Sequence, residues 1–286
     1  MAFVKILAPL TGGPRDETVL ASAISAALPF GGHVAGLFVR PDPALTMPFY
    51  GEGVSTVVVQ EVLETSKTES DQAAVTAQAA LIRLAKATDV SVTDGCQKLD
   101  APSVSFRETT GNFADCIARE ARLSDLAVFA ATKEDERVGV IEAVEAVLLE
   151  ARRPVMLSCR AVAPGFHDKI AIGWNASVES AQAVSAALPF LKRASRVDIL
   201  AVEQPDAPCA QCGALVEYLG LHGVAAHARE IKAGERSVAQ ALLEEAAGAG
   251  LLVLGGYGHS RWRELFVSGV TRQAIAHADL PLFLVH

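Results

Sequence analysis

The stretch AGAGLLVLGG, Ala247 to Gly256, predicts the class of fold. A continuous apolar run without polar alternation, ending in two glycines, is typical of a buried strand that leads into a turn, and such strands belong to parallel sheets. The residues that follow, GYGHSRWRELFVSGVT from Gly256 to Thr271, therefore start at the carboxyl edge of a parallel sheet. Ligands of open parallel sheets bind at this edge, beside the amino ends of helices.

An internal repeat sets the domain organisation. SAALPF occurs at residues 25–30 and again at 185–190, and the openings VKILAPLTGG and DKIAIGWNAS align so that Lys5 matches Lys169. Each half reads as five strands alternating with four helices, which predicts an α/β fold with two tandem, doubly wound, Rossmann-like domains, each with a five-stranded parallel sheet. We place the domains at residues 1–163 and 164–286, because Pro164 and Gly165 break the link between the halves.

Two further segments give specific expectations. SVAQALLEEAA, residues 237–247, predicts a helix that begins after an N-cap at Ser237 and buries Val238, Ala241 and Leu242. The first half carries a long insertion at residues 40–71, with an apolar tip at 47–51. This insertion is interpreted as a lid or interface, or as a solvent-exposed loop.

Composition excludes several classes of partner. The chain of 286 residues has 51% hydrophobic and 20% charged residues, a net charge of -8 and a pI near 5.4. Nucleic acids and anionic membranes attract positive surfaces, so we expect neither as a partner. We find no run of about 18 apolar residues and no signal peptide, and five scattered cysteines do not form a disulfide framework. A cytoplasmic protein with small-molecule or protein partners is expected.

The pair CAQC, Cys209 and Cys212, is the strongest redox or metal candidate. Two cysteines at this spacing near a helix start can have lowered thiol pKa values. A zinc site needs two more ligands, and no second pair is present, so no metal site is predicted. A thiol redox sensor and incidental thiols on a surface loop both remain open.

The paired halves, and above all LLVLGGYGHSRWRELFVSGVTRQAIAHADLPLFLV, resemble the universal stress protein family in its tandem-domain form over essentially the whole chain. The family signature is Gly, two residues, Gly, nine residues, then Gly followed by Ser or Thr, and ATP-binding members wrap this loop around the triphosphate. Gly255 and Gly258 match its first two positions. Ser268 stands at the third glycine position and Gly269 at the hydroxyl position, followed by Val270 and Thr271 as in many relatives.

This departure leaves two outcomes for the loop. A β-carbon at Ser268 interferes with close approach of a phosphate to the main chain, while its hydroxyl is a donor. The loop still binds phosphate if Ser268 and Gly269 have exchanged roles, so that Ser268 supplies the hydroxyl and Gly269 the close approach of the main chain. Arg261 and Arg263 either bind the polyphosphate or lie on a solvent-exposed face where the next helix begins. His259 either donates a hydrogen bond to a phosphate or packs on the loop.

The resemblance implies three further positions around the nucleotide. Asn175 stands where ATP-binding relatives often carry Asp near the adenine or ribose, although it also suits an N-cap of the next helix. Val202 matches a position whose main chain holds adenine. Gly234 matches a loop that closes over the nucleotide.

The first half has lost the glycine spacing. Its equivalent segment contains Glu134, Asp135 and Glu136, which would repel a polyphosphate, and Thr11 replaces the Asp or Asn position. We therefore expect packing surface, or a different pocket, in the first half and the nucleotide site in the second.

Three functional hypotheses follow. The first is a non-catalytic stress-response module that binds an adenine nucleotide, ATP above all, with Mg²⁺ as its companion ion. Its halves would form an internal pseudo-dimer, with a homodimer as a further option. The second is a scaffold that does not bind nucleotide, favoured by Ser268 and Asn175, and the third is the thiol sensor. No P-loop and no nucleophile elbow is present in the sequence, so an enzyme is not predicted.

Overall fold

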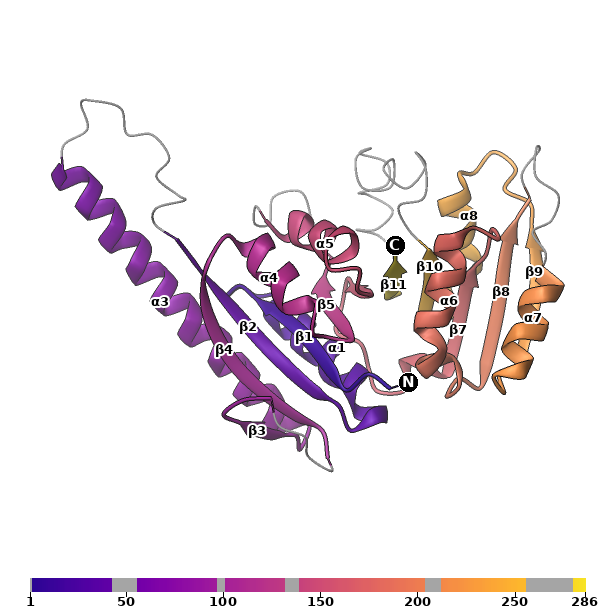
Figure 1. Ribbon diagram of the computed structural model, residues 1–286, viewed down its shortest axis with the longest axis horizontal. Helices are drawn as coiled ribbons and strands as arrows, with labels where there is room; N and C mark the ends of the chain where they lie inside the picture. The colour runs from indigo at the N-terminus through magenta and orange to yellow at the C-terminus, as the bar shows by residue number, and fades with distance from the viewer. Residues whose placement is uncertain (1, 43–55, 97–100, 132–138, 204–211, 256–279) are drawn as a thin grey trace.

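The computed structural model describes residues 2–42, 56–96, 101–131, 139–203, 212–255 and 280–286 (Figure 1). The first half contains β1 (Lys5–Leu10), α1 (Asp16–Ala27), the 3-10 helix η1 (Leu28–Phe30), β2 (His33–Pro41), α3 (Thr56–Ala87), β3 (Ser91–Thr93), β4 (Ser103–Gly111), α4 (Phe113–Ala121), β5 (Leu126–Ala130), α5 (Val140–Leu149) and β6 (Val155–Ser158). The second half contains the 3-10 helix η2 (Phe166–Asp168), β7 (Lys169–Gly173), α6 (Val178–Leu191), β8 (Arg196–Val202), α7 (Cys212–Leu221), β9 (Ala226–Ile231), α8 (Val238–Glu245), β10 (Leu251–Gly255) and β11 (Leu282–Val285).

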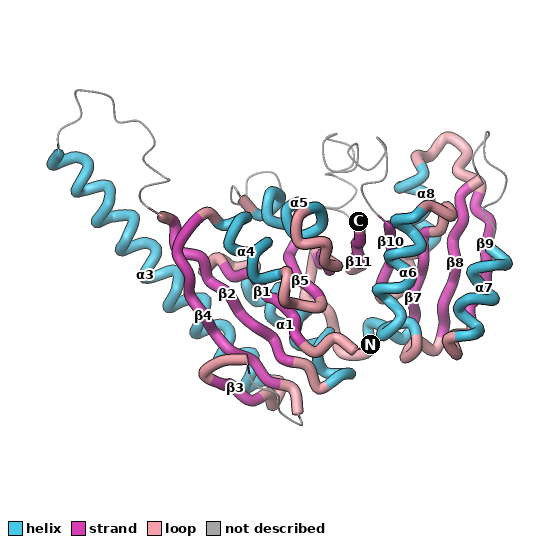
Figure 2. Tube along the Cα trace, viewed as in Figure 1, coloured by secondary structure: helices cyan, strands magenta, loops and turns pink. Residues whose placement is uncertain are grey.

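The two halves share one strand order. The first half runs β4-β2-β1-β5-β6 and the second β9-β8-β7-β10-β11, so that in each the first strand is central. All the strand pairs described within a half are parallel, and helices alternate with strands along the chain (Figure 2). β3 is an extra strand that pairs with β4 at the outer edge of the first half. The predicted fold class, two tandem doubly wound α/β units, is confirmed.

The two expected sheets are not separate. β6 and β11 pair antiparallel, with Met156 opposite Phe283, and join the halves into one continuous sheet of 11 strands. An unpaired edge strand exposes a row of N–H and C=O groups, and pairing the last strand of each half satisfies both edges at once. The link between the halves runs from the end of β6 at Ser158 to the start of β7 at Lys169. The division at residue 163 stays a prediction.

Helices cover both faces of this sheet, and each face has its own core. One core packs α1, α3, α6 and α7 against residues such as Ile6 and Phe283, while the other packs α4, α5 and α8 against residues such as Leu7 and Leu284. Neighbouring residues of β1 and β11 thus point to opposite faces, as the period of a strand requires. Each core contains residues of both halves, so the apolar layers continue across the β6–β11 junction.

Phenylalanine rings reinforce this junction. Phe190 in α6 is fully buried, and its ring centroid lies 4.6 Å from that of Phe3 and 5.5 Å from that of Phe30. Phe283 in β11 lies 6.2 Å from Phe190 and 6.1 Å from Phe3. Aromatic pairs at these separations contribute beyond the area that they bury. Residues from both halves therefore share one aromatic cluster.

The insertion of the first half leads into a long helix. Residues 56–71 belong to α3, which has 32 residues and extends past the sheet in Figure 1. The apolar tip at 47–51 lies outside the described residues. Val75 and Ile82, seven positions apart on α3, are 60% and 48% exposed, so part of its surface is apolar and open. No helix in the described ranges, α3 included, has the length and apolar content needed to cross a membrane.

Acidification is expected to destabilise the first half through His33. The imidazole is buried between the hydroxyls of Ser103 and Ser105, both 2.8 Å from a ring nitrogen. Burial, assisted by the charge of Lys5, lowers the pKa of His33 below 6.5. As the pH falls, the unfolded chain therefore binds a proton at His33 before the folded chain does. The stability that neutral His33 contributes is fully present above pH 6.5 and is lost as the pH falls through the lower pKa of the folded state.

The melting temperature measured at falling pH tests this expectation. His33→Gln keeps hydrogen-bonding groups near both hydroxyls without titrating, so its melting temperature should fall less between about pH 7 and pH 5. Some slope should remain, because burial also lowers the pKa of His167. If the melting temperature falls equally with pH in the unmodified protein and in His33→Gln, His33 does not contribute to the pH dependence of stability.

Candidate functional site

The strand order places a ligand crevice in each half where the chain turns from one side of the sheet to the other. This point lies between β1 and β5 in the first half and between β7 and β10 in the second. In the second half, Leu254 pairs with Gly173, so the carboxyl ends of β7 and β10 lie side by side.

Four of the predicted nucleotide-site residues are described, and all belong to this edge. Asn175 follows β7, Gly255 is the last residue of β10, and Val202 is the last residue of β8. Gly234 follows β9 with a φ of 61°, a left-handed conformation that suits glycine. The remaining predicted residues, Gly258, His259, Arg261, Ser268, Gly269, Val270 and Thr271, lie outside the described part of the chain.

Position 255 requires glycine because the backbone of α6 packs closely against it, a contact that the sequence does not reveal. A β-carbon at this position would lie 2.3 Å from the backbone N of Ser180 and 2.3 Å from the carbonyl carbon of Glu179, in the first turn of α6. No side chain fits at that distance from a backbone. The amino end of α6 therefore lies directly against the end of β10, at the crevice.

Asn175 does not cap α6, contrary to one reading of the sequence. The N-cap is Ser177, whose hydroxyl accepts a hydrogen bond from the N–H of Ser180 at 3.1 Å. The Asn175 Oδ1 accepts from the N–H of Ser177, also at 3.1 Å, and so shapes the turn that leads into the helix. The side-chain amide group of Asn175 remains as a donor.

The turn after the first strand has the same backbone conformation in both halves. Gly12 has a φ of 72° and Ala176, its counterpart in the repeat, a φ of 58°. A left-handed conformation is unfavourable for alanine, and such strain is concentrated at functional sites. The conserved shape of this turn makes its polar contacts directly comparable between the halves.

In the first half, a carboxylate from the chain itself fills this turn. Asp16 is 3% exposed and accepts hydrogen bonds from the N–H of Thr11 at 2.9 Å, from its hydroxyl at 3.0 Å and from the N–H of Gly12 at 2.7 Å. Arg15 donates to the carbonyl of Ala131, just after β5, and bridges the crevice. The chain's own charged side chains thus occupy this edge of the first half.

In the second half, no carboxylate of the described residues accepts from the backbone of this turn. Ser180 stands at the position of Asp16, and its hydroxyl donates to the carbonyl of Ser177 at 2.9 Å. Within the described residues, the N–H groups of Asn175 and Ala176 have no acceptor. Two backbone donors near the amino end of α6 form a binding place for an anion. No sequence pattern singles out Asp16 and Ser180, although the match of Lys5 with Lys169 also aligns these two residues.

The other candidates of the sequence analysis are only partly described. Cys212 is the first residue of α7, while Cys209 lies outside the described residues, so the redox hypothesis stays a prediction. A search of the described residues finds no group of three or more His, Cys, Asp or Glu side chains arranged to hold a metal ion.

Comparison with known proteins identifies the architecture. No family model matches the sequence, and no curated protein matches it either. Among solved structures, a universal stress protein from Archaeoglobus fulgidus superimposes with a TM-score of 0.65 over 98% of this chain and 95% of its own, at 15% identity. The chain has the universal stress protein fold.

Two structures from Pseudomonas aeruginosa support this assignment of the universal stress protein fold. A protein assigned to the universal stress proteins has a TM-score of 0.54 at 13% identity, over 99% of this chain and 93% of its own. A protein of unknown function has the same TM-score at 12% identity, over 99% of this chain and 92% of its own. All three matches cover nearly the whole of this chain, both halves included.

Proposed function

We propose that this protein is a non-catalytic stress-response module whose second half binds an adenine nucleotide, ATP above all. The observation that carries the proposal is the turn at Asn175 and Ala176, whose two N–H groups have no acceptor among the described residues, whereas Asp16 supplies a carboxylate to the matching turn of the first half. These donors lie at the amino end of α6 and beside β10, where nucleotide phosphates bind in sheets of this type.

The other residues take the roles that the resemblance implies. Gly255, Gly258 and Gly269 carry the loop around the phosphates, with Ser268, Val270 and Thr271 at its far end and with His259 and Arg261 as donors. Asn175 contacts the ribose or adenine, the main chain at Val202 holds the adenine, and Gly234 closes over it. Mg²⁺ is bound largely by phosphate oxygens and water in such complexes, so it needs no dedicated cluster of protein ligands.

A scaffold without nucleotide is the second candidate, and α3 favours it. Its exposed Val75 and Ile82 lie on one stripe of a long helix that contacts the sheet only along part of its length. Exposed apolar stripes often bind other proteins. The nucleotide titration below decides between the two functions.

Calorimetric titration with ATP, ADP and AMP tests the proposal, after bound ligand has been removed from the purified protein. Gly258→Val should weaken ATP binding by about a hundredfold or more, because its side chain displaces phosphate from N–H groups whose charge-assisted bonds are worth about 1.5–3 kcal/mol each. Ser268→Gly should retain or tighten binding. Arg261→Ala should lower affinity for ATP more than for AMP.

The control uses the corresponding turn of the first half. Thr11→Ala removes a hydroxyl from the turn that Asp16 fills and should leave nucleotide affinity unchanged. If the unmodified protein binds none of the three nucleotides at about millimolar concentration, a weak limit for any ligand site, the nucleotide proposal is wrong and the scaffold takes its place.

A further inference from the structure

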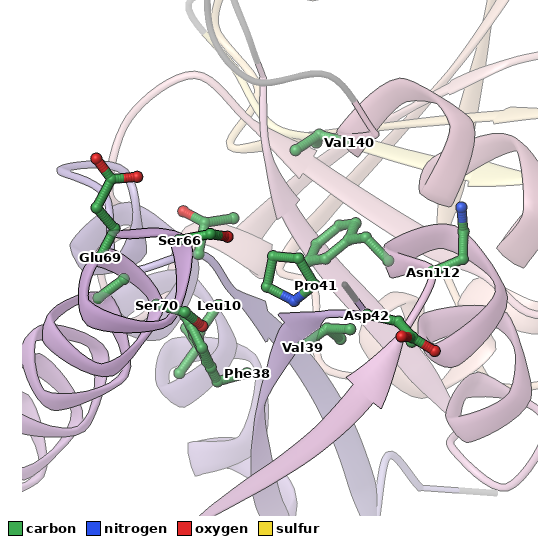
Figure 3. A pocket seen from close by; sticks show the side chains of 14 residues that line it. Leu10, Phe38, Val39, Pro41, Asp42, Ser66, Glu69, Ser70, Asn112 and Val140 are labelled. Carbon is green, nitrogen blue, oxygen red and sulfur yellow. The ribbon is translucent and has the colours of Figure 1, made fainter. Parts of the chain in front are cut away.

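A separate pocket lies at the carboxyl edge of the first half. It is enclosed by the ends of β1, β2 and β4, the starts of α4 and α5, and α3 (Figure 3), and has a volume of 390 Å³. This volume falls within the range of small-molecule sites. The described residues that line it are Leu10, Thr11, Phe38, Val39, Pro41, Asp42, Ser66, Glu69, Ser70, Ala73, Gly111, Asn112, Phe113 and Val140.

The inner wall of the pocket is apolar. Leu10 and Phe38 belong to the buried core at the ends of β1 and β2, and Phe113 and Val140 pack on the core of the other face. In Figure 3, Val39 and Pro41 lie between the α3 side of the pocket and the α4 side. A ligand must therefore bring an apolar body of its own, since burying polar groups against this wall without partners is unfavourable.

Two polar groups face this apolar wall from opposite sides. The Oγ of Ser70 on α3 is buried and has no hydrogen-bond partner among the described residues. Asn112 uses its Oδ1 to cap α4, accepting from the N–H of Asp115 at 3.1 Å, which leaves its amide NH₂ to donate. Native proteins seldom leave a buried hydroxyl unpaired, and a ligand that binds here gives it a partner.

The described residues that line the pocket carry negative charge. Asp42 and Glu69 are among its lining residues, on opposite sides in Figure 3, and the lining given above contains no Lys, Arg or His. Arg40 lies close by in the sequence, but it is held in ion pairs with Glu108 at 2.5 Å and Asp71 at 2.6 Å. A polyphosphate would meet like charge here, whereas a cation would be attracted.

We infer that the first half binds a small organic cation with an apolar body, such as an arylalkylamine, in this pocket. The apolar part lies against Phe38 and Phe113, and the ammonium group stays near the carboxylates of Asp42 and Glu69 at the rim. The protein would then bind two ligands of opposite charge, one in each half.

Tryptamine and indole-3-propionate provide a matched pair of probes, since they share a ring and differ in the sign of charge. In calorimetric titrations, tryptamine should bind at a single site and at least about fivefold more tightly than indole-3-propionate. Glu69→Gln and Asp42→Asn should each weaken tryptamine binding about two- to fivefold, the range for partly exposed charges. Glu64→Gln, the same change on an exposed residue of α3 outside the lining, should have no effect.

A pocket-filling variant provides an independent readout. Ser70→Leu places apolar volume inside the pocket and should abolish tryptamine binding, while the melting temperature of the same variant reports whether it is folded. The inference is overturned if tryptamine does not bind, if indole-3-propionate binds equally well, or if Glu64→Gln weakens binding as much as Glu69→Gln. None of these outcomes depends on whether the second half binds ATP.

Discussion

Replacing Phe190 with alanine is expected to lower the free energy of unfolding by about 3–5 kcal/mol, the range for truncating a buried aromatic side chain. Phe190 is fully buried, and its ring contacts Phe3 and Phe30 of the first half and Phe166 and Phe283 of the second. For a chain of 286 residues, the melting temperature should fall by about 5–8 °C. Differential scanning calorimetry measures this change.

The position of Phe190 between the halves predicts more than lost stability. Phe129, which is 2% exposed in β5, is a matched control because its ring is buried within the first half. Phe129→Ala should cost a similar free energy while the halves still unfold together. Phe190→Ala should separate the unfolding of the two halves, seen as a broader or double transition. A single sharp transition for both variants would contradict the role of Phe190 in joining the halves.

The repeat predicted most of the fold because it is carried by local patterns. Buried runs such as the one ending at Gly255 and caps such as Ser237 depend on nearby residues only, and both are confirmed, the cap with an N–H of Gln240 bound at 3.1 Å. The antiparallel pairing of β6 with β11 was not predicted. It joins segments more than a hundred residues apart, and no residue pattern marks which edge strands will meet.

The candidate site was predictable only in part, for a similar reason. Asn175, Val202, Gly234 and Gly255 lie at one carboxyl edge of the sheet, because parallel strands bring their carboxyl ends together. The contact of Gly255 with Glu179 and Ser180 was not foreseen, since it depends on how closely α6 approaches β10. The contrast between Asp16 and Ser180 required the hydrogen bonds themselves, because an Asp near a helix start usually suggests only a favourable charge.

Asp16→Ala is expected to have the second large effect, a loss of about 2–4 kcal/mol of stability, because it removes a buried carboxylate that holds several donors. The N–H and hydroxyl of Thr11 and the N–H of Gly12 would lose their acceptor. Asp16→Asn is the matched control, since its amide oxygen retains one acceptor without the charge, and it should cost clearly less. Urea unfolding measures both differences.

Formate tests whether the emptied turn takes an anion from solution. It is the smallest carboxylate, and binding only to the folded state raises the melting temperature with its concentration. Sodium formate should therefore stabilise Asp16→Ala more than sodium chloride at equal ionic strength, whereas the unmodified protein should respond alike to both salts. If formate gives no extra stability, the turn does not bind anions, and the argument for Asn175 and Ala176 loses its support. Rescue by formate would show that this backbone turn accepts an anion wherever the chain supplies no carboxylate, which is the situation that Ser180 creates in the second half.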